Sequence, residues 1–196
     1  MTSIASIVEG DGEVVALPLL LRRLASEWND GAMVNALQPI RVRRDKFLNK
    51  EDEFRRQLLL AAAKCGNDGW ILIVLDADDD CPVALAQEIR ARAKQYVPHR
   101  RLSVVLANRE FEAWFIAAAR SLHGIRGFSL FGDECPQAEI PRNAKGWMKE
   151  HIQGGRYSEI LDQPAFTAKF DLQQAYQNSR SFRKLCKEWE LNTTEK

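Results

Sequence analysis

Cysteine and histidine are scarce in this sequence of 196 residues. Its four cysteines form no C-x-x-C pair, and its three histidines do not have the spacing of metal ligands. A structural zinc site draws its thiolates and imidazoles from such pairs, so we expect none here. The thiols should stay reduced, as in a cytoplasmic protein that needs no disulfide to fold.

Long apolar runs and an excess of charge of one sign are also missing. No apolar stretch approaches the roughly 20 residues that cross a bilayer, and we expect no signal peptide at the acidic start of the chain. The 28 basic and 27 acidic side chains nearly cancel, which excludes binding of nucleic acid through bulk positive charge. Any contact with nucleic acid must therefore come from a local basic patch.

The chain does contain an alternation of strand and helix patterns. Runs of apolar and β-branched residues predict strands at 3–8, 38–42, 70–75 and 101–107. Apolar residues at helical spacing predict helices at 13–28, 52–64, 82–96 and 110–122. Such alternation is typical of a mostly parallel sheet with helices on both faces, so the predicted class is α/β and Rossmann-like. The segment 70–75 is apolar on successive residues and is the predicted central strand.

Beyond residue 123 the pattern changes. A loop rich in glycine and proline begins at residue 124, and helices are expected at 142–152, 165–178 and 181–190. We therefore divide the chain into an α/β core, residues 1–123, and a small helical appendage, residues 124–196. A helical segment of this size buries too little apolar surface to stand alone, so it should pack on the core as one structural unit.

Acidic residues follow three of the predicted strands. Glu9 closes the first strand. The third is followed by Asp76, Asp78, Asp79 and Asp80, and the fourth by Glu110 and Glu112. Open α/β sheets bind ligands beyond the carboxyl ends of their strands, so these acids should face one crevice. Like charges at such short range oppose folding unless a cation lies among them. Oxygen ligands without nearby His or Cys therefore predict a Mg²⁺ or Mn²⁺ site.

Each acid also has a structural interpretation. Asp79 and Asp80 could cap the helix that follows them. Glu13 could complement the dipole of its helix, and Glu112 could be a solvated surface charge. Asp76 is different, because it follows six apolar residues of a strand that should be buried, where an unpaired carboxylate is costly.

Two motifs resemble the Toprim domain of topoisomerases, bacterial primases, recombination factors and OLD-type nucleases. They are VEGDGE after the first predicted strand and LDADDD after the third. In that superfamily a glutamate after the first strand acts in acid/base chemistry and a D-x-D pair binds Mg²⁺, which implies these roles for Glu9 and for Asp76 and Asp78. The segments REFEAWF and DQPAFTAKFDLQQAYQNSRSF extend the likeness, to an uncharacterised bacterial Toprim-like family, over nearly the whole chain.

The resemblance to OLD-type nucleases implies further site residues. Additional acids and a lysine complete the site there, which makes Glu13, Asp80, Glu112 and Lys169 the matching candidates. The chain lacks the zinc module of primases, the separate breakage domain of topoisomerases and the G-x-x-x-x-G-K-[ST] motif of the OLD ATPase half. If an ATPase is required, it must be a partner chain, as in bacterial defence operons of similar arrangement.

Together these features predict metal-dependent hydrolysis of phosphodiester bonds in nucleic acid. Mg²⁺ or Mn²⁺ would be held by Glu9, Asp76 and Asp78, with Asp80 and Glu112 as further ligands. The proton would be relayed by Glu9 or Glu13, and Lys169 would offset charge on the phosphate. Nucleic acid would be bound by the basic stretch after the second predicted strand, formed by Arg41, Arg43, Arg44 and Lys46.

Three alternatives remain open. The chain could be a noncatalytic Toprim-like module that binds a partner protein or nucleic acid. It could also be a small-molecule phosphatase or phosphotransferase, since D-x-D with Mg²⁺ serves phosphoryl transfer generally. Dinucleotide binding at Gly10-x-Gly12 ranks last, because the G-x-G-x-x-G pattern has Val15 in place of its third glycine.

Overall fold

A parallel sheet forms the centre of the molecule. The computed structural model describes residues 1–28, 33–131 and 137–193. Within them five strands pair in the order β2-β1-β4-β5, and β3 pairs with β1. The strands are β1 (Thr2–Val8), β2 (Val34–Ala36), β3 (Ile40–Arg41), β4 (Trp70–Asp76) and β5 (Arg101–Ala107). Every pairing among them is parallel, so the predicted α/β class is confirmed.

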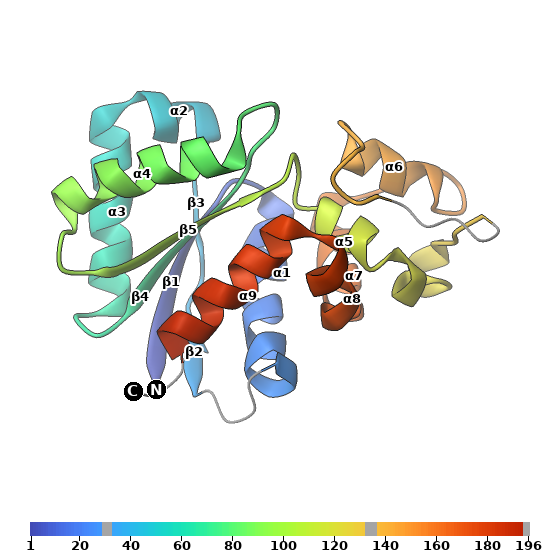
Figure 1. Ribbon diagram of the computed structural model, residues 1–196, viewed down its shortest axis with the longest axis horizontal. Coiled ribbons are helices and arrows are strands. Elements are labelled where there is room, and N and C mark those ends of the chain that lie inside the picture. The colour runs from blue at the N-terminus through green and yellow to red at the C-terminus, as the bar shows by residue number, and fades with distance from the viewer. Residues whose placement is uncertain (29–32, 132–136, 194–196) are drawn as a thin grey trace.

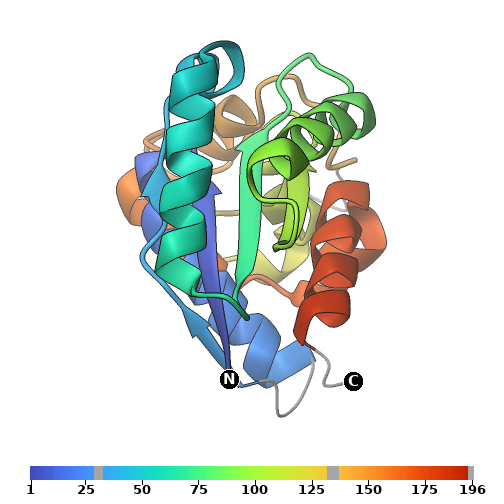
Figure 2. The same cartoon turned by 90° about the vertical axis from the view of Figure 1, so that its left-hand side faces the viewer.

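Helices cover both faces of this sheet (Figures 1 and 2). One face carries α2 (Arg44–Asn49), α3 (Glu51–Cys65) and α4 (Pro82–Tyr96). The other carries α1 (Asp11–Arg23), α5 (Ala113–Ala117), α6 (Ala144–Glu150), α7 (Glu159–Thr167), α8 (Leu172–Asn178) and α9 (Arg180–Thr193). Among the described segments, every helix falls short of the length and apolar character that a membrane span requires.

The two layers follow from the alternation of side chains along the strands. On β4, Ile71 and Ile73 belong to the hydrophobic cluster beneath α2, α3 and α4, whereas Trp70 and Leu72 belong to the cluster on the opposite face. All seven residues of β4 are buried, as predicted for a central strand. Asp76 lies an even number of residues after Trp70 and Leu72, so its side chain is directed to the same face of the sheet, the one that carries α1, α5 and α7.

The C-terminal helices share a hydrophobic core with the sheet. Leu17 of α1, Val74 of β4, Phe166 of α7 and Trp189 of α9 are all buried in one cluster. Helix α7 packs along α1, and α9 packs against β5 (Figure 1). The core of the appendage is therefore continuous with that of the α/β segment.

Close packing of α1 on α7 depends on a glycine. A Cβ atom at position 12 would lie 2.1 Å from Gln163 Oε1 and 2.4 Å from the carbonyl oxygen of Glu159. No other residue fits in that space without moving one helix. Gly12 therefore serves the packing of α1 on α7, which explains this glycine without a dinucleotide.

Some elements differ from the sequence predictions. The edge strand β2 has three residues, too few for a periodic pattern, and was not predicted. The predicted helix 110–122 is reduced to α5 and a 3₁₀ turn at Ala119–Leu122. The predicted helix 13–28 is α-helical only to Arg23 and ends in a π-helical turn. The predicted helix 165–178 is two helices, because Asp171 Oδ1 accepts a hydrogen bond from Gln174 N at 2.7 Å and starts α8.

Candidate functional site

The candidate site lies where the strand order of the sheet reverses. From β1 the chain passes to β2 and β3 on one side, and it then returns to β4 on the other. The register pairs Ile7 with Ile73, so Glu9 and Asp76 leave the sheet at the same edge. Such a switch point is where open α/β proteins bind their ligands.

Asp76 is buried at the end of β4, with only 7% of its surface exposed. Its Oδ1 accepts a hydrogen bond from Phe111 N at 2.8 Å, which holds the carboxylate against the turn that follows β5. Burial raises the pKa of Asp76 well above its usual range, and the carboxylates of Glu13 and Glu112 raise it further. Glu9 adds to the same effect. Asp76 therefore has the other candidate acids as its electrostatic neighbours.

Glu13 is also buried, in the first turn of α1. Its Oε2 accepts a hydrogen bond from Glu9 N at 3.2 Å. Burial raises the pKa of Glu13 to about 7, although hydrogen bonds from the amides of Glu9 and Gly10 partly offset this rise. An acid that only complements a helix dipole would be solvated. The burial of Glu13 instead places it with the acids of the site.

Glu112 lies directly before α5 and is fully buried. Its Oε1 accepts hydrogen bonds from the Tyr157 hydroxyl at 2.8 Å and from Gln163 Nε2 at 2.7 Å. Its Oε2 is buried without a hydrogen-bond partner in the described part of the chain. Burial raises the pKa of Glu112. The interpretation of Glu112 as a solvated surface charge is therefore wrong.

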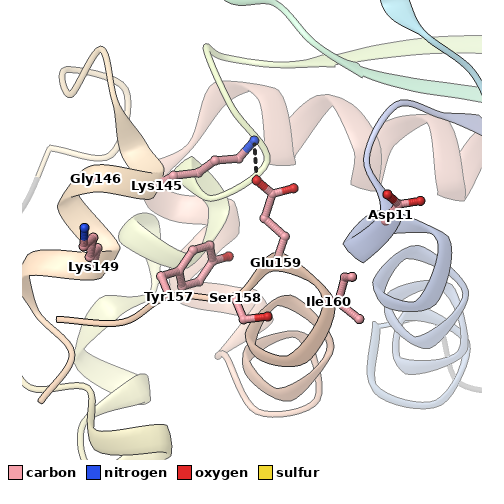
Figure 3. Close-up of a pocket in the computed structure, with 8 residues that line it drawn as sticks. All are labelled: Asp11, Lys145, Gly146, Lys149, Tyr157, Ser158, Glu159 and Ile160. Carbon is pink, nitrogen blue, oxygen red and sulfur yellow. Dashed lines mark ion pairs between the residues drawn. The ribbon is translucent and has the colours of Figure 1, made fainter. Parts of the chain in front are cut away.

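A lysine that the sequence reasoning did not select joins these acids. Lys145 of α6 places its Nζ 3.2 Å from Glu159 Oε1 (Figure 3), and its amide donates a hydrogen bond to Glu110 Oε2 at 2.8 Å. Burial lowers the pKa of Lys145, but the nearby carboxylates of Glu112 and Asp76 outweigh that effect, so its pKa is raised. The ammonium group therefore remains charged beside the acids.

Lys169, the lysine that the resemblance suggested, lies elsewhere. It is exposed just beyond the C-terminal end of α7, whereas the site contacts Glu159 at the start of that helix. At this far end, Arg23 of α1 donates a hydrogen bond to the carbonyl oxygen of Thr167 at 2.9 Å. Lys145 reaches this region because the start of α6 is hydrogen-bonded to Glu110 in the turn after β5, and no local pattern in the sequence encodes that contact.

Glu9 lies between the buried acids and an arginine. Burial raises the pKa of Glu9, and the carboxylate of Asp78 raises it further. The charges of Arg44 and Lys145 act in the opposite direction. Glu9 Oε2 is buried and has no hydrogen-bond partner among the described residues. Glu9 therefore interacts electrostatically both with the buried acid Asp76 and with Asp78 in the loop after β4.

Two acids of that loop are bound by one arginine. Arg44 lies 3.3 Å from Asp78 Oδ2 and 2.6 Å from Asp80 Oδ2. Its Nε also donates a hydrogen bond to the carbonyl oxygen of Asp76 at 3.1 Å. Asp78 and Asp80 are exposed. The structure thus brings Asp78 and Asp80 together around Arg44 rather than burying them beside Asp76.

Asp79 is engaged by two further arginines. It forms ion pairs with Arg109 at 2.8 Å and with Arg142 at 2.7 Å. The hydrogen bond from Arg142 is the main cause that lowers the pKa of Asp79. The N-cap of α4 is Cys81, and no side chain accepts a hydrogen bond there. The prediction that Asp79 or Asp80 caps this helix is therefore wrong.

The basic stretch after β3 does not form one open patch. Arg41 Nε lies 2.8 Å from Asp11 Oδ1, and Arg44 is occupied by the loop acids. Arg43 and Lys46 are exposed and form no ion pair with a described side chain. Two of the four basic side chains are therefore available to a ligand.

A cavity of about 400 Å³ opens beside Lys145 (Figure 3). Lys149 of α6, Tyr157 and Ser158 also line it, together with Asp11 at the start of α1. Tyr157 donates its hydroxyl hydrogen to Glu112, and the charges of Glu112 and Asp76 raise the pKa of Lys145. None of the buried acids lines the cavity itself, so Tyr157 and Lys145 are the residues that relate it to the acid group.

The acids offer oxygen donors for a cation but no finished metal site. Across the described residues, no group of three or more His, Cys, Asp or Glu side chains has the arrangement that holds a metal ion. The donor chemistry fits a hard cation, since carboxylates are the protein ligands that Mg²⁺ prefers. The buried oxygens Glu9 Oε2 and Glu112 Oε2 also lack hydrogen-bond partners among those residues. A cation would find suitable oxygens here, and the side chains would have to rearrange around it.

Comparison with known proteins identifies a family. The family model described as "Domain of unknown function (DUF4276)" matches residues 8–190. A search of curated proteins and a search of solved structures found no match. The matched range includes all the acids of the site and Lys145. The chain therefore belongs to the DUF4276 family.

Proposed function

We propose that this member of the DUF4276 family is a Toprim-type nuclease, which hydrolyses phosphodiester bonds in nucleic acid with Mg²⁺ or Mn²⁺. The observation that carries the proposal is the joint burial of Glu13, Asp76 and Glu112 at the switch point of the sheet. Glu9 and Lys145 complete the group. Acids with strongly raised pKa values in such a position are typical of catalytic sites. Glu9 and Asp76 are also the positions that the VEGDGE and LDADDD motifs assign to Toprim chemistry.

The cation would be held by Glu9, Asp76 and Asp78, with Glu112 as a further oxygen donor. When bound, Mg²⁺ or Mn²⁺ would polarise a phosphate and favour the ionisation of water. Its charge would also reduce the repulsion among the buried acids, which one lysine offsets only in part. Asp78 and Asp80 both form ion pairs with Arg44, and the cation would compete with that arginine for either of them; Asp80 is less suited to this role because its ion pair is the shorter one, 2.6 Å against 3.3 Å.

Glu13 is the residue best suited to transfer a proton. Its pKa of about 7, raised by burial, leaves both protonation states populated near neutral pH. That is the condition under which general acid/base catalysis is most effective. The hydrogen bond from Glu9 N at 3.2 Å orients the Glu13 carboxyl group at the strand ends. Glu13 would therefore hold or deliver the proton, and Glu9 would bind the cation.

Lys145 would stabilise the negative charge that develops on the phosphate during hydrolysis. Its ammonium group lies beside the buried acids and lines the 400 Å³ cavity, and Lys149 lines the same cavity. Fixed positive charge at the position where charge develops lowers the barrier more than the same charge in water. This role replaces the one that the resemblance implied for Lys169.

Nucleic acid would reach the site along the basic stretch after β3. The register pairs Arg41 with Val8, so this stretch leaves the sheet at the same edge as Glu9. Arg43 and Lys46 are the exposed cations that could bind phosphates there. If an ATPase is needed for activity, it would be a separate partner chain, because the sequence has no G-x-x-x-x-G-K-[ST] motif.

The test is a cleavage assay on plasmid, single-stranded DNA and RNA with Mg²⁺ or Mn²⁺. We expect cleavage by the parent protein and none by Asp76→Asn. The matched control is Asp162→Asn, because Asp162 is equally buried at 5% exposure but binds Arg126 and the amide of Ser158 instead. The proposal is wrong if the parent cleaves none of the three substrates with either metal.

A small-molecule phosphatase is the second candidate. The cavity beside Lys145 has about 400 Å³, which lies within the range of roughly 300–1,000 Å³ found for small-molecule sites. The same assay should include a generic phosphomonoester such as p-nitrophenyl phosphate. Hydrolysis of the monoester without cleavage of any polymer would favour the phosphatase over the nuclease.

A further inference from the structure

A second cavity, of about 540 Å³, lies between α4 and α9. Ala86 of α4, Val104 and Leu106 of β5, and Lys184 of α9 are among the residues that line it. None of the acids described above lines this cavity. It is therefore a separate feature of the surface, which we call the β5 groove.

The β5 groove runs along an edge of the sheet. Helix α4 covers one face of the sheet and α9 covers the opposite face, with β5 between them (Figures 1 and 2). A cavity lined by both helices must therefore pass along the edge that separates the two faces. In the described sheet, β5 is the last strand and pairs only with β4. The other side of an edge strand carries backbone N–H and C=O groups that can pair with an added strand. In β5 all residues after Arg101 are buried, so a segment would reach these groups through the cavity.

The floor of the groove is apolar. Val104 and Leu106 lie there, and Val83 and Ala86 line the wall formed by α4. Val83 is 66% exposed, although it is a large apolar side chain. An apolar floor at an edge strand favours the alternating apolar side chains of an added strand over a purely polar segment.

The rim of the groove is positively charged. Arg90 of α4 and Arg180 and Lys184 of α9 line it, as do Glu139 and Glu188. Both glutamates are already engaged: Glu139 Oε1 accepts a hydrogen bond from Arg180 N at 2.6 Å, and Glu188 Oε1 lies 2.5 Å from Lys184 Nζ. Arg90 and Arg180 form no ion pair with any side chain in the described ranges. Glu139 keeps its negative charge, because a backbone amide is neutral, but the three basic side chains of the rim outnumber its two acidic ones, so the rim is positive on balance.

We propose that the β5 groove binds an extended acidic segment of a partner protein, which adds to β5 as a further strand. Backbone hydrogen bonds to β5 would give affinity, and alternate side chains would give specificity. Apolar side chains of the segment would pack on Val104 and Leu106. Its carboxylates would bind Arg90 and Arg180. This binding would not depend on the proposed nuclease activity.

An extended segment suits the groove better than a helix does. An α-helix with its side chains is about 10 Å wide, and its own backbone groups are already paired, so it could not bond to the edge of β5. Charge complementarity adds a second constraint, because like charges opposed across an interface are strongly unfavourable. The partner segment should therefore combine strand-forming residues with acids and contain few lysines or arginines.

The test measures the binding of labelled hexapeptides to the full chain by fluorescence anisotropy. The probes alternate valine or leucine with glutamate and have blocked termini. Matched probes carry lysine in place of glutamate, or N-methyl groups on alternate backbone nitrogens in both registers. We expect the glutamate probes to bind saturably and the lysine and N-methylated probes to bind roughly tenfold more weakly or not at all. Hydrogen exchange in residues 101–107 should slow when a glutamate probe is added.

A charge-reversal variant tests the rim. We expect Arg90→Glu combined with Arg180→Glu to weaken binding of the glutamate probes roughly tenfold. The control combines Lys94→Glu with Lys187→Glu, which makes the same change in charge on the same two helices outside the cavity. Absence of saturable binding by any glutamate probe would overturn the proposal. So would equal binding of the lysine or N-methylated probes, or equal weakening by the control.

Discussion

The acids at the end of β4 fall into two groups with opposite surroundings. Asp76 is buried, and the charges that act most on its carboxylate are those of other acids and of Lys145. Asp78, Asp79 and Asp80 follow it within four residues, yet all three are exposed and are bound by arginines. The exposed acids are paired with arginines although water could solvate them, whereas the buried acids form no ion pair with an arginine of the described ranges, and burial raises their pKa values so that they tend to bind protons instead. Within these ranges the buried acids are thus the ones that lack an arginine partner, and a bound cation would stabilise them more than it would the exposed acids.

Lys145→Met should have the largest effect, because it removes the lysine whose charge acts on the buried carboxylates of Asp76 and Glu112. If the nuclease proposal is correct, we expect cleavage to fall about 100-fold or more, since a fixed charge at the phosphate is lost. The matched control is Lys169→Met, which removes an exposed lysine at the far end of α7. The measurement is the initial rate of cleavage at saturating Mg²⁺.

The comparison of these two variants decides whether Lys145 or Lys169 takes part in the cleavage reaction. Equal loss in the two variants would place Lys169 in the reaction after all. Loss in Lys169→Met alone would show that Lys145 only balances the charge of the buried acids. An intact fold in both variants should be checked by circular dichroism, because Lys145 also binds Glu159 at 3.2 Å.

The pH dependence of stability should distinguish the buried acids from the exposed ones. Burial raises the pKa of Glu13 in the folded state from 4.5 to about 7, so the folded protein binds more protons than the unfolded chain between these values. Stability from this group is therefore fully present below pH 4.5 and is lost as the pH rises through 7. The loss can reach about 3 kcal/mol. Asp76 contributes with the same sign.

Urea unfolding between about pH 5 and about pH 8, with a chelator present, measures this effect. We expect the free energy of unfolding of the parent to fall with pH and that of Glu13→Gln to fall less steeply. The control is Glu53→Gln, which removes an acid whose lowered pKa, caused mainly by a hydrogen bond from Gln57, already lies below this range. A slope that is the same in the parent and in Glu13→Gln would contradict the assignment of Glu13 to the buried group.

The fold was predictable from the sequence because its main signals are local. The continuous apolar run of β4 and the proline at the start of α4 identify both elements without tertiary information. The helices and strands that were predicted wrongly are those whose formation or limits depend on tertiary contacts. The strand β2 exists because Val34 pairs with Thr2 at an edge, and α8 begins where Asp171 caps it.

The site was predictable in part for the same reason. Glu9 and Asp76 follow strands, and parallel strands bring their carboxyl ends to one edge. Lys145 and Tyr157 come from the appendage, and their positions depend on how α6 and α7 pack over the strand ends. The partners of Asp78 were also unforeseen, since Arg44 was assigned to nucleic acid. Ion pairs between residues far apart in the sequence leave no local pattern from which they could be predicted.

Arg44→Ala should have a moderate effect on stability. It removes ion pairs to Asp78 and Asp80 and a hydrogen bond to the carbonyl oxygen of Asp76, and its side chain is only 18% exposed. We expect a loss of about 1–2 kcal/mol in the free energy of unfolding. Arg43→Ala is the control, because Arg43 is exposed and should change stability by less than about 0.5 kcal/mol. An equal effect of both substitutions would show that the loop is not held by Arg44.

Asp79→Asn should have the smallest effect of all. The hydrogen bond from Arg142 is the main cause that lowers the pKa of Asp79 from 3.8, so any stability it contributes is present above that value and is lost only in more acidic solution. Between about pH 5 and about pH 8 the variant should therefore match the parent both in the midpoint of urea unfolding and in its slope with pH. Both partners are exposed, and exposed ion pairs add little to stability. A changed slope would mean that Asp79 interacts with the buried acids, and the division between the two groups would then fail.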